Sequence, residues 1–335
     1  MILIFTIKFD YSSTCVIRWL NHYGVKVVRI NGDDNTYQFD AINSKGIFFR
    51  NTLTDELINL REATACWWRR TGITHNQLND KTFQIDRNRL VSTNEFLLSH
   101  IKGHVNEEML ALKDYIFEIL YNTIPINLGK PLFDLNRLII LDLADKYELK
   151  VPQFEIIKDG KQLIESQKKI GNVVTKAISN GIYSDYQGKR YYTYTELLEN
   201  EFYESNHQNT FSPSLISELV EKKYEIRSFY IEGKFYSMAI FSQSNEKTRI
   251  DFRKYANNKN VPYQLPLEIE EKLIRLFKKL DLNCGSVDLI VDKQDNFIFL
   301  EINPVGQFGM TSEPCNYNLE KIVANYLRNG RIRTN

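Results

Sequence analysis

The chain has 335 residues, of which 43% are hydrophobic and 25% are charged, and its formal net charge is +1. This length is sufficient for two or three domains, each with its own core. A charge so close to neutral argues against a dedicated nucleic-acid-binding protein, because neutralising phosphates requires a basic excess. Local basic spots remain at Arg69 and Arg70 and in the tail at 328–335, and a tail of this kind is typically solvated.

The cysteines and the N-terminus indicate the compartment. Cys15, Cys66, Cys284 and Cys315 are scattered, with no CxxC pair and no metal-ligand spacing, which is typical of thiols in a reducing compartment. The N-terminus is apolar for seven residues and lacks a basic segment, so it predicts a core strand rather than a signal peptide. No apolar run approaches the roughly 20 residues needed to span a bilayer. We therefore expect a cytoplasmic protein that does not bind membranes.

The first 125 residues show a β-α-β pattern. A helix capped by Ser12 or Ser13 is expected to end at Gly24, because serine favours helix N-caps and glycine favours the position after a helix. In chain order the pattern predicts a strand at 2–7, that helix, a strand at 25–30, a strand within 64–72 and a long helix at 88–120. Turn residues at 122–131 mark the first domain boundary.

The remainder of the chain mixes helices and strands. The expected elements are a helix at 134–148, strands at 150–157 and 171–176, a tyrosine-rich hairpin at 183–195, a polar connection at 200–214, strands at 225–231 and 234–242, a helix at 266–282, and strands at 286–292 and 297–303. The hairpin turns about Gln187 and Gly188. This order indicates α/β or α+β layers without internal repeats.

The last two expected strands, at 286–292 and 297–303, form a hairpin that carries acidic residues. The predicted pairs are Asp292–Phe297, Ile290–Phe299, Asp288–Glu301 and Ser286–Asn303. One face of this hairpin is an apolar set with period two, formed by Val287, Leu289, Val291, Ile298, Leu300 and Ile302. We expect that face to be core, which leaves Asp288, Glu301 and Asn303 clustered at one end of the other face.

Two carboxylates directly opposite each other destabilise an antiparallel pair. A raised pKa on one acid, a basic side chain between them or a divalent cation would relieve the repulsion. Two carboxylates and a carboxamide are hard oxygen ligands that suit Mg²⁺. The alternative is a solvated sheet face whose acids have no role.

Several basic residues lie on or beside predicted strands. Lys176 ends an apolar strand before a loop that contains Gly181, so it is a candidate phosphate contact, although a surface lysine is the alternative. Arg227 and Arg253 lie on or beside strands, where arginine binds carboxylates and phosphates or forms edge salt bridges. The motif G-x-x-x-x-G-K-[ST] is missing from the sequence, so the loop is not a Walker loop. The motif G-x-G-x-x-G is also missing, which argues against the nicotinamide-dependent oxidoreductase that a β-α-β start would suggest.

Residues 130–325 resemble the ATP-grasp ligases. The resemblance depends on the order of Arg137, Lys176, the segment 217–227, "DFR", "VDLIVD" and "EINPVGQ". The chain further resembles the peptide maturases that make graspetides, of the microviridin and grasp-with-spasm types. The segments that carry this resemblance are "ATACWWRR", "DLNRLIILDLADKYELKVP", "DFRKYA" and "CNYNLEKIVANYL". This resemblance covers almost the full chain. It implies an α/β (α+β) ATP-grasp fold with an N-terminal Rossmann-like pre-ATP-grasp domain at 1–125, a central subdomain at 126–214 and a C-terminal subdomain at 215–335.

The resemblance also implies the roles of individual residues. Metal ions would be held by Asp288, Glu301 and Asn303. ATP would be contacted by Arg137, Lys176, Gly181, Ser184, Glu218, Leu219, Val220 and Glu225. Arg137 stands where the family usually has lysine, Ser217 stands where many relatives have glutamine, and Glu225 would reach either the ribose or a metal-bound phosphate. Arg227 and Arg253 would bind the substrate carboxylate and its acyl phosphate.

The resemblance implies a reaction and a partner. Mg²⁺ and ATP would activate an Asp or Glu side chain of a ribosomal precursor peptide, and a Ser, Thr or Lys side chain would close an ester or amide ring. The leader of that peptide docks away from the chemistry. The tyrosine-rich hairpin is the candidate dock, because aromatic residues are favoured at interfaces, and a packed edge hairpin is the alternative. A homodimer is also compatible with the family.

Two other functions stay open. A RimK-like ligase of the same fold would add a free amino acid to a protein or to a small-molecule carboxylate. A binding module would use ATP as a regulatory ligand without turnover. The metal set and both arginines favour an enzyme over the module.

Overall fold

The computed structural model describes residues 1–78, 95–131, 135–179, 181, 183–193, 195–243 and 258–331. It divides into two compact units, which we call the first unit (Met1–Phe133, Val305–Gly309 and Asn318–Asn335) and the second unit (Asp134–Pro304 and Met310–Tyr317). Within the described residues, no helix has the length and apolar character to cross a membrane. The predicted division into three domains at 125 and 214 stays a prediction.

The first unit is built on a four-stranded parallel sheet with the strand order β2-β1-β6-β7. Its elements are β1 (Ile2–Thr6), α1 (Tyr11–His22), β2 (Val27–Asn31), β3 (Tyr37–Asn43), β4 (Gly46–Asn51), β5 (Leu57–Asn59), the 3₁₀ turn η1 (Leu60–Glu62), β6 (Ala65–Trp68), α2 (His75–Leu78), α3 (Glu95–Thr123), β7 (Ile126–Leu128) and α9 (Leu319–Asn329). The β-α-β start predicted from the sequence is present. The description of this domain as Rossmann-like stays a prediction.

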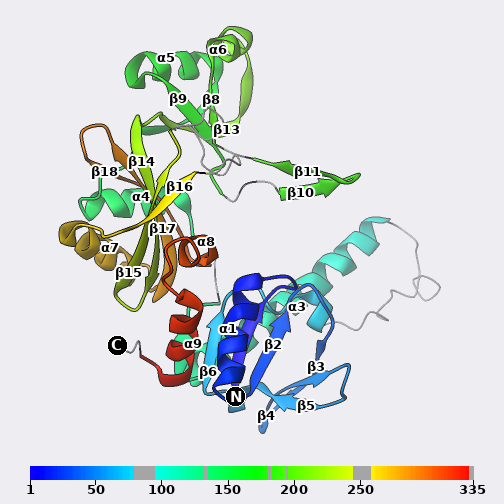
Figure 1. Cartoon of the computed structure of the whole chain (residues 1–335). Coiled ribbons are helices and arrows are strands. Elements are labelled where there is room, and N and C mark those ends of the chain that lie inside the picture. The colour runs from blue at the N-terminus through cyan, green and yellow to red at the C-terminus, as the bar shows by residue number, and fades with distance from the viewer. Residues whose placement is uncertain are drawn as a thin grey trace. The chain divides into compact units, whose positions relative to one another are not determined.

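Every residue of β1 is buried, which is expected of a parallel strand covered on both faces. Leu3 and Phe5 share a hydrophobic cluster with Phe117 of α3, while α9 packs on α1 and contacts β6. Helices α1, α3 and α9 surround the sheet within this unit (Figure 1). The apolar run at the N-terminus is therefore core, as predicted.

Three details of the first unit differ from the predictions. Helix α1 is capped by Asp10, whose side chain accepts from the Ser13 N–H, and not by Ser12 or Ser13. The antiparallel sheet of β3, β4 and β5 was not predicted. The long helix is described from Glu95 to Thr123, and the predicted start at 88–94 lies outside the described residues.

Arg69, which the sequence marks as a local basic spot, is buried and only 2% exposed. Its Nε donates to Asp10 at 3.0 Å, and its Nη1 donates to the carbonyl oxygen of Gly306 at 2.9 Å. The guanidinium also lies over the rings of Trp67 and Phe308. Arg69 is thus a buried link between β6, the cap of α1 and the segment 305–309.

The second unit contains two antiparallel sheets and a separate hairpin, with the strand orders β12-β9-β13-β8, β16-β15-β14-β17-β18 and β10-β11. Its elements are α4 (Arg137–Lys146), β8 (Phe154–Asp159), α5 (Gly160–Ile170), β9 (Val173–Lys176), β10 (Tyr183–Tyr186), β11 (Lys189–Tyr192), β12 (Glu196–Leu197), α6 (Asn200–Asn206), β13 (Thr210–Glu218), β14 (Lys222–Ile231), β15 (Lys234–Phe241), β16 (Lys259–Tyr263), α7 (Leu267–Lys279), β17 (Cys284–Asp292), β18 (Phe297–Asn303) and most of α8 (Gly309–Ser312).

Helices α4 and α7 cover one face of the five-stranded sheet. Leu141 of α4 and Phe277 of α7 share one hydrophobic cluster with Val287 and Leu289 of β17, and both helices lie on the same side of that sheet (Figure 1). Residues that alternate with Val287 and Leu289 therefore point to the opposite face of the sheet. That opposite face carries the polar residues of the candidate site.

Two segments of this unit were predicted differently. The stretch 200–214 was expected to be a polar connection, but it forms α6 and the start of β13, because Tyr203 is buried in a small core with Leu163 of α5. Helix α5 was not predicted. The hairpin was predicted correctly: Gln187 and Gly188 have φ values of 52° and 73°, as a tight two-residue turn requires.

Candidate functional site

The site face of the five-stranded sheet contains the facing carboxylates that the sequence predicted. Asp288 of β17 pairs with Glu301 of β18, and Ser286 pairs with Asn303. Asp288 is also the register partner of Arg227 on β14. These pairings bring two carboxylates, one carboxamide and one guanidinium to the same part of the sheet.

The predicted register is wrong beyond this point. A bulge between Asp288 and Leu289 pairs Ile290 with Ile298 and Val291 with Phe297, where the sequence predicted Ile290–Phe299 and Asp292–Phe297. The bulge shifts β18 by one residue, so Phe299 joins the core cluster of β17 with 0% exposure. Ile298 is buried outside that cluster, and the predicted core residue Leu300 is only partly buried. Burying an aromatic ring supplies more apolar area than burying the aliphatic side chain, which favours the shifted register.

Asp288 is paired with a buried arginine. The Nη1 of Arg227 donates to both carboxylate oxygens of Asp288 at 3.1 and 3.2 Å, and its Nη2 donates to the Ser286 hydroxyl at 3.3 Å. The side chain of Arg227 is 6% exposed and that of Asp288 is 16% exposed. This contact removes part of the repulsion between Asp288 and Glu301.

Glu301 has an arginine of its own. The Nη2 of Arg137 lies 2.8 Å from Oε2 of Glu301, and its Nη1 donates to the carbonyl oxygen of Ala177. Arg137 is the first residue of α4, and Ala177 directly follows Lys176 at the end of β9. One side chain therefore connects β18 to the predicted phosphate-binding end of β9.

The donor set fits a magnesium ion. Asp288, Glu301 and Asn303 offer hard oxygens that come from neighbouring positions on two paired strands. In the part of the chain that the structure describes, no group of three or more His, Cys, Asp or Glu side chains could hold a metal ion. A metal at this sheet face would therefore depend on the Asn303 carboxamide as well as on both acids. The repulsion between the facing acids is relieved in the structure by their basic partners, Arg227 and Arg137. The oxygen donors of the site are also compatible with a divalent cation.

The predicted adenine-binding segment connects the two large sheets. β13 ends at Glu218 and β14 begins at Lys222. Glu218 exchanges backbone and side-chain bonds with Gln153, and the Leu219 N–H donates to Asn172 at 2.8 Å. These bonds hold the backbone of Glu218 and Leu219 in place. Val220, the third residue of the predicted adenine-binding segment, is the next residue along the chain.

Glu225 is buried in a cluster that the sequence reasoning missed. Its side chain forms an ion pair with Lys222, and Oε1 also accepts from the Ser242 hydroxyl at 2.8 Å. Glu225 and Lys222 are each 6% exposed. The signal was present in the stretch "EKKYEIR", but lysine and glutamate three positions apart on a regular strand point to opposite faces.

The remaining predicted residues are less connected. Gly181 and Ser184 are exposed, and an added side chain at Gly181 would collide with the Thr193 hydroxyl. Arg253 lies outside the described residues.

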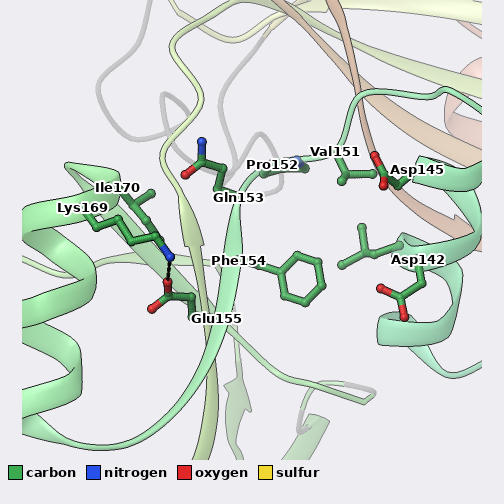
Figure 2. Close-up of a pocket in the computed structure, with 10 residues that line it drawn as sticks. Asp142, Asp145, Val151, Pro152, Gln153, Phe154, Glu155, Lys169 and Ile170 are labelled. Carbon is green, nitrogen blue, oxygen red and sulfur yellow. Dashed lines mark hydrogen bonds and ion pairs between the residues drawn. The ribbon is translucent and has the colours of Figure 1, made fainter.

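A pocket of about 400 Å³ lies between α4, the segment 151–153, β8 and the end of α5, and its lining residues are drawn in Figure 2. Phe154 and the aliphatic side chains Leu141, Val151 and Ile170 contribute its apolar lining, and Lys169 pairs with Glu155 at 2.6 Å. The pocket contains none of the predicted site residues. It does share Gln153 with the contacts of Glu218, so it borders the connection between the sheets.

The chain is similar to solved structures over almost its full length. No protein-family model and no curated protein matches it. Among solved structures, it is similar to macrocyclase MdnC bound with precursor peptide MdnA from Microcystis aeruginosa MRC, with 24% identity, a TM-score of 0.75, and coverage of 99% of this chain and 100% of that one. It is also similar to a Chryseobacterium gregarium RiPP-associated ATP-grasp ligase in complex with ADP and a leader and core peptide, with 22% identity, a TM-score of 0.74, and coverage of 99% and 97%.

A RimK domain ATP-grasp protein from Sphaerobacter thermophilus DSM 20745 is similar at 10% identity, with a TM-score of 0.54 and coverage of 97% of this chain and 98% of that one. The three likenesses run over almost the full length of each chain. They establish the fold: this chain has an α/β fold of the ATP-grasp type, as the sequence predicted.

Proposed function

We propose that this protein is a cytoplasmic, Mg²⁺-dependent and ATP-dependent ligase that forms ester or amide rings within a ribosomally made precursor peptide. The observation that carries the proposal is the pairing of Asp288 with Glu301 on the polar face of an ATP-grasp sheet. The likeness in fold to a macrocyclase and to a ligase that were each solved with a peptide supports a peptide substrate. A homodimer stays a prediction.

The proposed reaction has two steps. A carboxylate oxygen of an Asp or Glu side chain in the peptide attacks the γ-phosphorus of ATP, and ADP leaves. A Ser or Thr hydroxyl or a Lys amine of the same peptide then attacks the acyl carbon and expels phosphate. The two steps together remove one water from the peptide for each ring.

The residues of the site divide this work between charge and position. Bound Mg²⁺ would supply charge stabilisation at the phosphate oxygens, held by Asp288, Glu301 and Asn303. Arg137 holds Glu301 in place. We assign a phosphate contact to Arg137 and Lys176 because Lys176 ends β9 and the Arg137 guanidinium donates to Ala177, the next residue. Arg227 keeps Asp288 oriented, and with Arg253 it is assigned to the substrate carboxylate. Removing one such charged group typically costs on the order of 10²- to 10³-fold in rate.

The nucleotide is proposed to follow β14 from its beginning. The segment 218–220 directly precedes this strand, Glu225 comes next on the site face, and Arg227 with its partner Asp288 follows two residues later. Adenine, ribose and phosphates occur in the same order in ATP. This order favours the ribose as the ligand of Glu225 over a metal-bound phosphate. Gly181 and Ser184 are assigned to the loop that covers the phosphates.

The leader of the peptide is proposed to dock on the hairpin of β10 and β11. This hairpin is a two-stranded sheet of its own, and it exposes Tyr186 and Tyr191 by 62% and 51%. Exposed tyrosines provide large contact areas at little entropic cost, because the side chain has only two rotatable χ angles. The separate hairpin is compatible with a docking element as well as with a packed edge.

The test is the intact mass of the short Thr- and Asp/Glu-rich peptide encoded beside this gene, after incubation with enzyme, ATP and Mg²⁺. Loss of one water per ring, with one ADP formed for each, is the expected result. A mass gain equal to an added amino acid would instead indicate a RimK-like ligase. Binding of ADP with neither a mass change nor ADP formation would contradict the proposal and favour the regulatory module.

A further inference from the structure

The cluster of Lys222, Glu225 and Ser242 is built by an irregularity in β14. In the register with β17, Lys222 pairs with Asp292 and Tyr224 pairs with Val291, so β14 contains one extra residue between them. An extra residue in one strand turns the preceding side chain to the other face of the sheet. The bulge therefore places Lys222 on the same face as Glu225, where a regular strand would separate them.

The cluster is buried, and it is anchored from two strands. The side chains of Lys222 and Glu225 are 4% and 8% exposed. The Ser242 hydroxyl follows β15 and donates to the same oxygen, Oε1, that receives the Lys222 ammonium. Two donors at one oxygen fix the rotation of the carboxylate, and the ammonium balances its negative charge.

We propose that Lys222 is a positioning residue that orients the Glu225 carboxylate toward the nucleotide ribose and neutralises it beside the phosphates. This inference rests on the proposed function. A carboxylate without a cation beside it would repel an incoming polyphosphate. With its charge balanced and its rotation fixed by two donors, the carboxylate is oriented to accept hydrogen bonds from ribose hydroxyls.

The neighbouring Lys223 provides a matched control. It carries the same charge one position along the chain, but it pairs with Asp295 at 2.6 Å, and the two side chains are 38% and 73% exposed. Lys223→Met therefore removes a charge of the same sign from the same strand without touching Glu225. Lys222→Arg keeps the charge and tests whether the cation is what matters.

The experiment measures the Kd of ADP and of 2′-deoxy-ADP, both with Mg²⁺, for the full chain. In the wild type, ADP is expected to bind more tightly because of its extra hydroxyl. Lys222→Met is expected to weaken ADP by about tenfold or more, the loss typical of a hydrogen bond to a charged group. It should weaken 2′-deoxy-ADP less, so that the ratio of the two constants falls toward one. Lys222→Arg should restore much of the ratio, and Lys223→Met should leave it unchanged.

Lys222→Met leaves Glu225 buried without its cation and can fail to fold. The double variant Lys222→Met/Glu225→Gln has no buried charge in this cluster, so it keeps the test decisive. It is expected to fold and to bind ADP and 2′-deoxy-ADP equally. A wild-type ratio in either folded variant would overturn the inference. If the wild type does not bind ADP with Mg²⁺, the proposed function itself is refuted. If the wild type forms rings but the ratio of the two dissociation constants is the same in the Lys222 variants, only the inference about Lys222 is refuted.

Discussion

Both units of the protein contain an arginine bound to a carboxylate, but the pairs differ in how far they are buried. In the first unit, the side chains of Arg69 and Asp10 are 3% and 5% exposed. In the second unit, Arg227 and Asp288 are 6% and 16% exposed, and Arg137 and Glu301 are 20% and 30% exposed. The Arg69–Asp10 pair, which links elements of the fold, is therefore less exposed than the two pairs at the candidate site.

The difference separates structural from functional use of the same chemistry. Arg69 has additional partners in the carbonyl oxygens of Val305 and Gly306, so its charge is satisfied within the fold. The carboxylates of Asp288 and Glu301 keep an exposed fraction that a metal or nucleotide could reach. Losing a partner should therefore damage stability in the first unit and activity in the second.

The largest effect on stability is expected from Arg69→Met. This change leaves Asp10 buried without its cation, so the free energy of unfolding should fall by about 3–5 kcal/mol. All three tryptophans, Trp19, Trp67 and Trp68, lie in the first unit, so tryptophan fluorescence in urea reports on that unit. Arg50→Met is the control, because its pairs with Asp40 and Asp55 are exposed and should contribute about 1 kcal/mol or less. Equal losses in the two variants would break the comparison.

The carboxylates of the site should show the opposite behaviour. Glu301→Ala is expected to lower the rate of ADP formation by about 10²- to 10³-fold or more, with tryptophan fluorescence and circular dichroism as in the wild type. Asp288→Asn should do the same, and it is preferable to Asp288→Ala because asparagine still offers an oxygen to the buried Arg227. Activity within tenfold of the wild type in either variant would refute the metal assignment.

A pH titration sharpens the comparison in the first unit. Burial alone would raise the pKa of Asp10, but Arg69, the Ser13 N–H and Arg70 together lower it below the usual value. The stabilisation by this carboxylate is therefore complete above the usual aspartate pKa of about 3.9 and is lost as the pH falls through the lower pKa of the folded state. The urea midpoint of tryptophan fluorescence should fall more steeply below about pH 4 in the wild type than in Asp10→Asn. Parallel curves would show that Asp10 does not titrate in this way.

The smallest effect is expected at the more exposed of the two pairs at the candidate site. Arg137→Lys keeps a positive charge near Glu301 and should change the free energy of unfolding by about 1 kcal/mol or less. Lysine cannot bridge Ala177 and Glu301 with a planar fork, so the KM for ATP should rise a few-fold while kcat is nearly kept. A loss of kcat as large as that of Glu301→Ala would mean that Arg137 takes part in the chemistry rather than in binding.

Much of the fold follows from local patterns. Period-two alternation located β14, β15, β17 and β18, and it paired Asp288 with Glu301 correctly. The bulge beside Leu289 could not be predicted from alternation, because it depends on which side chain fills the core. In the shifted register, Phe299 fills it. Helix α6 escaped because its sequence is polar, and only the packing of Tyr203 reveals its buried side.

The sequence by itself determined the mixture of helices and strands in α/β layers, the two strands that carry the acids and the residue types that suit Mg²⁺, because these depend on alternation and on spacing within a few residues. Only the tertiary structure decided the partners of those acids. Arg137 and Glu301 are 164 positions apart, Lys222 reaches Glu225 only through a bulge, and Arg69 is buried by segments from both ends of the chain. Side-chain pairing over such separations depends on how the layers pack, and a local pattern carries no information about that.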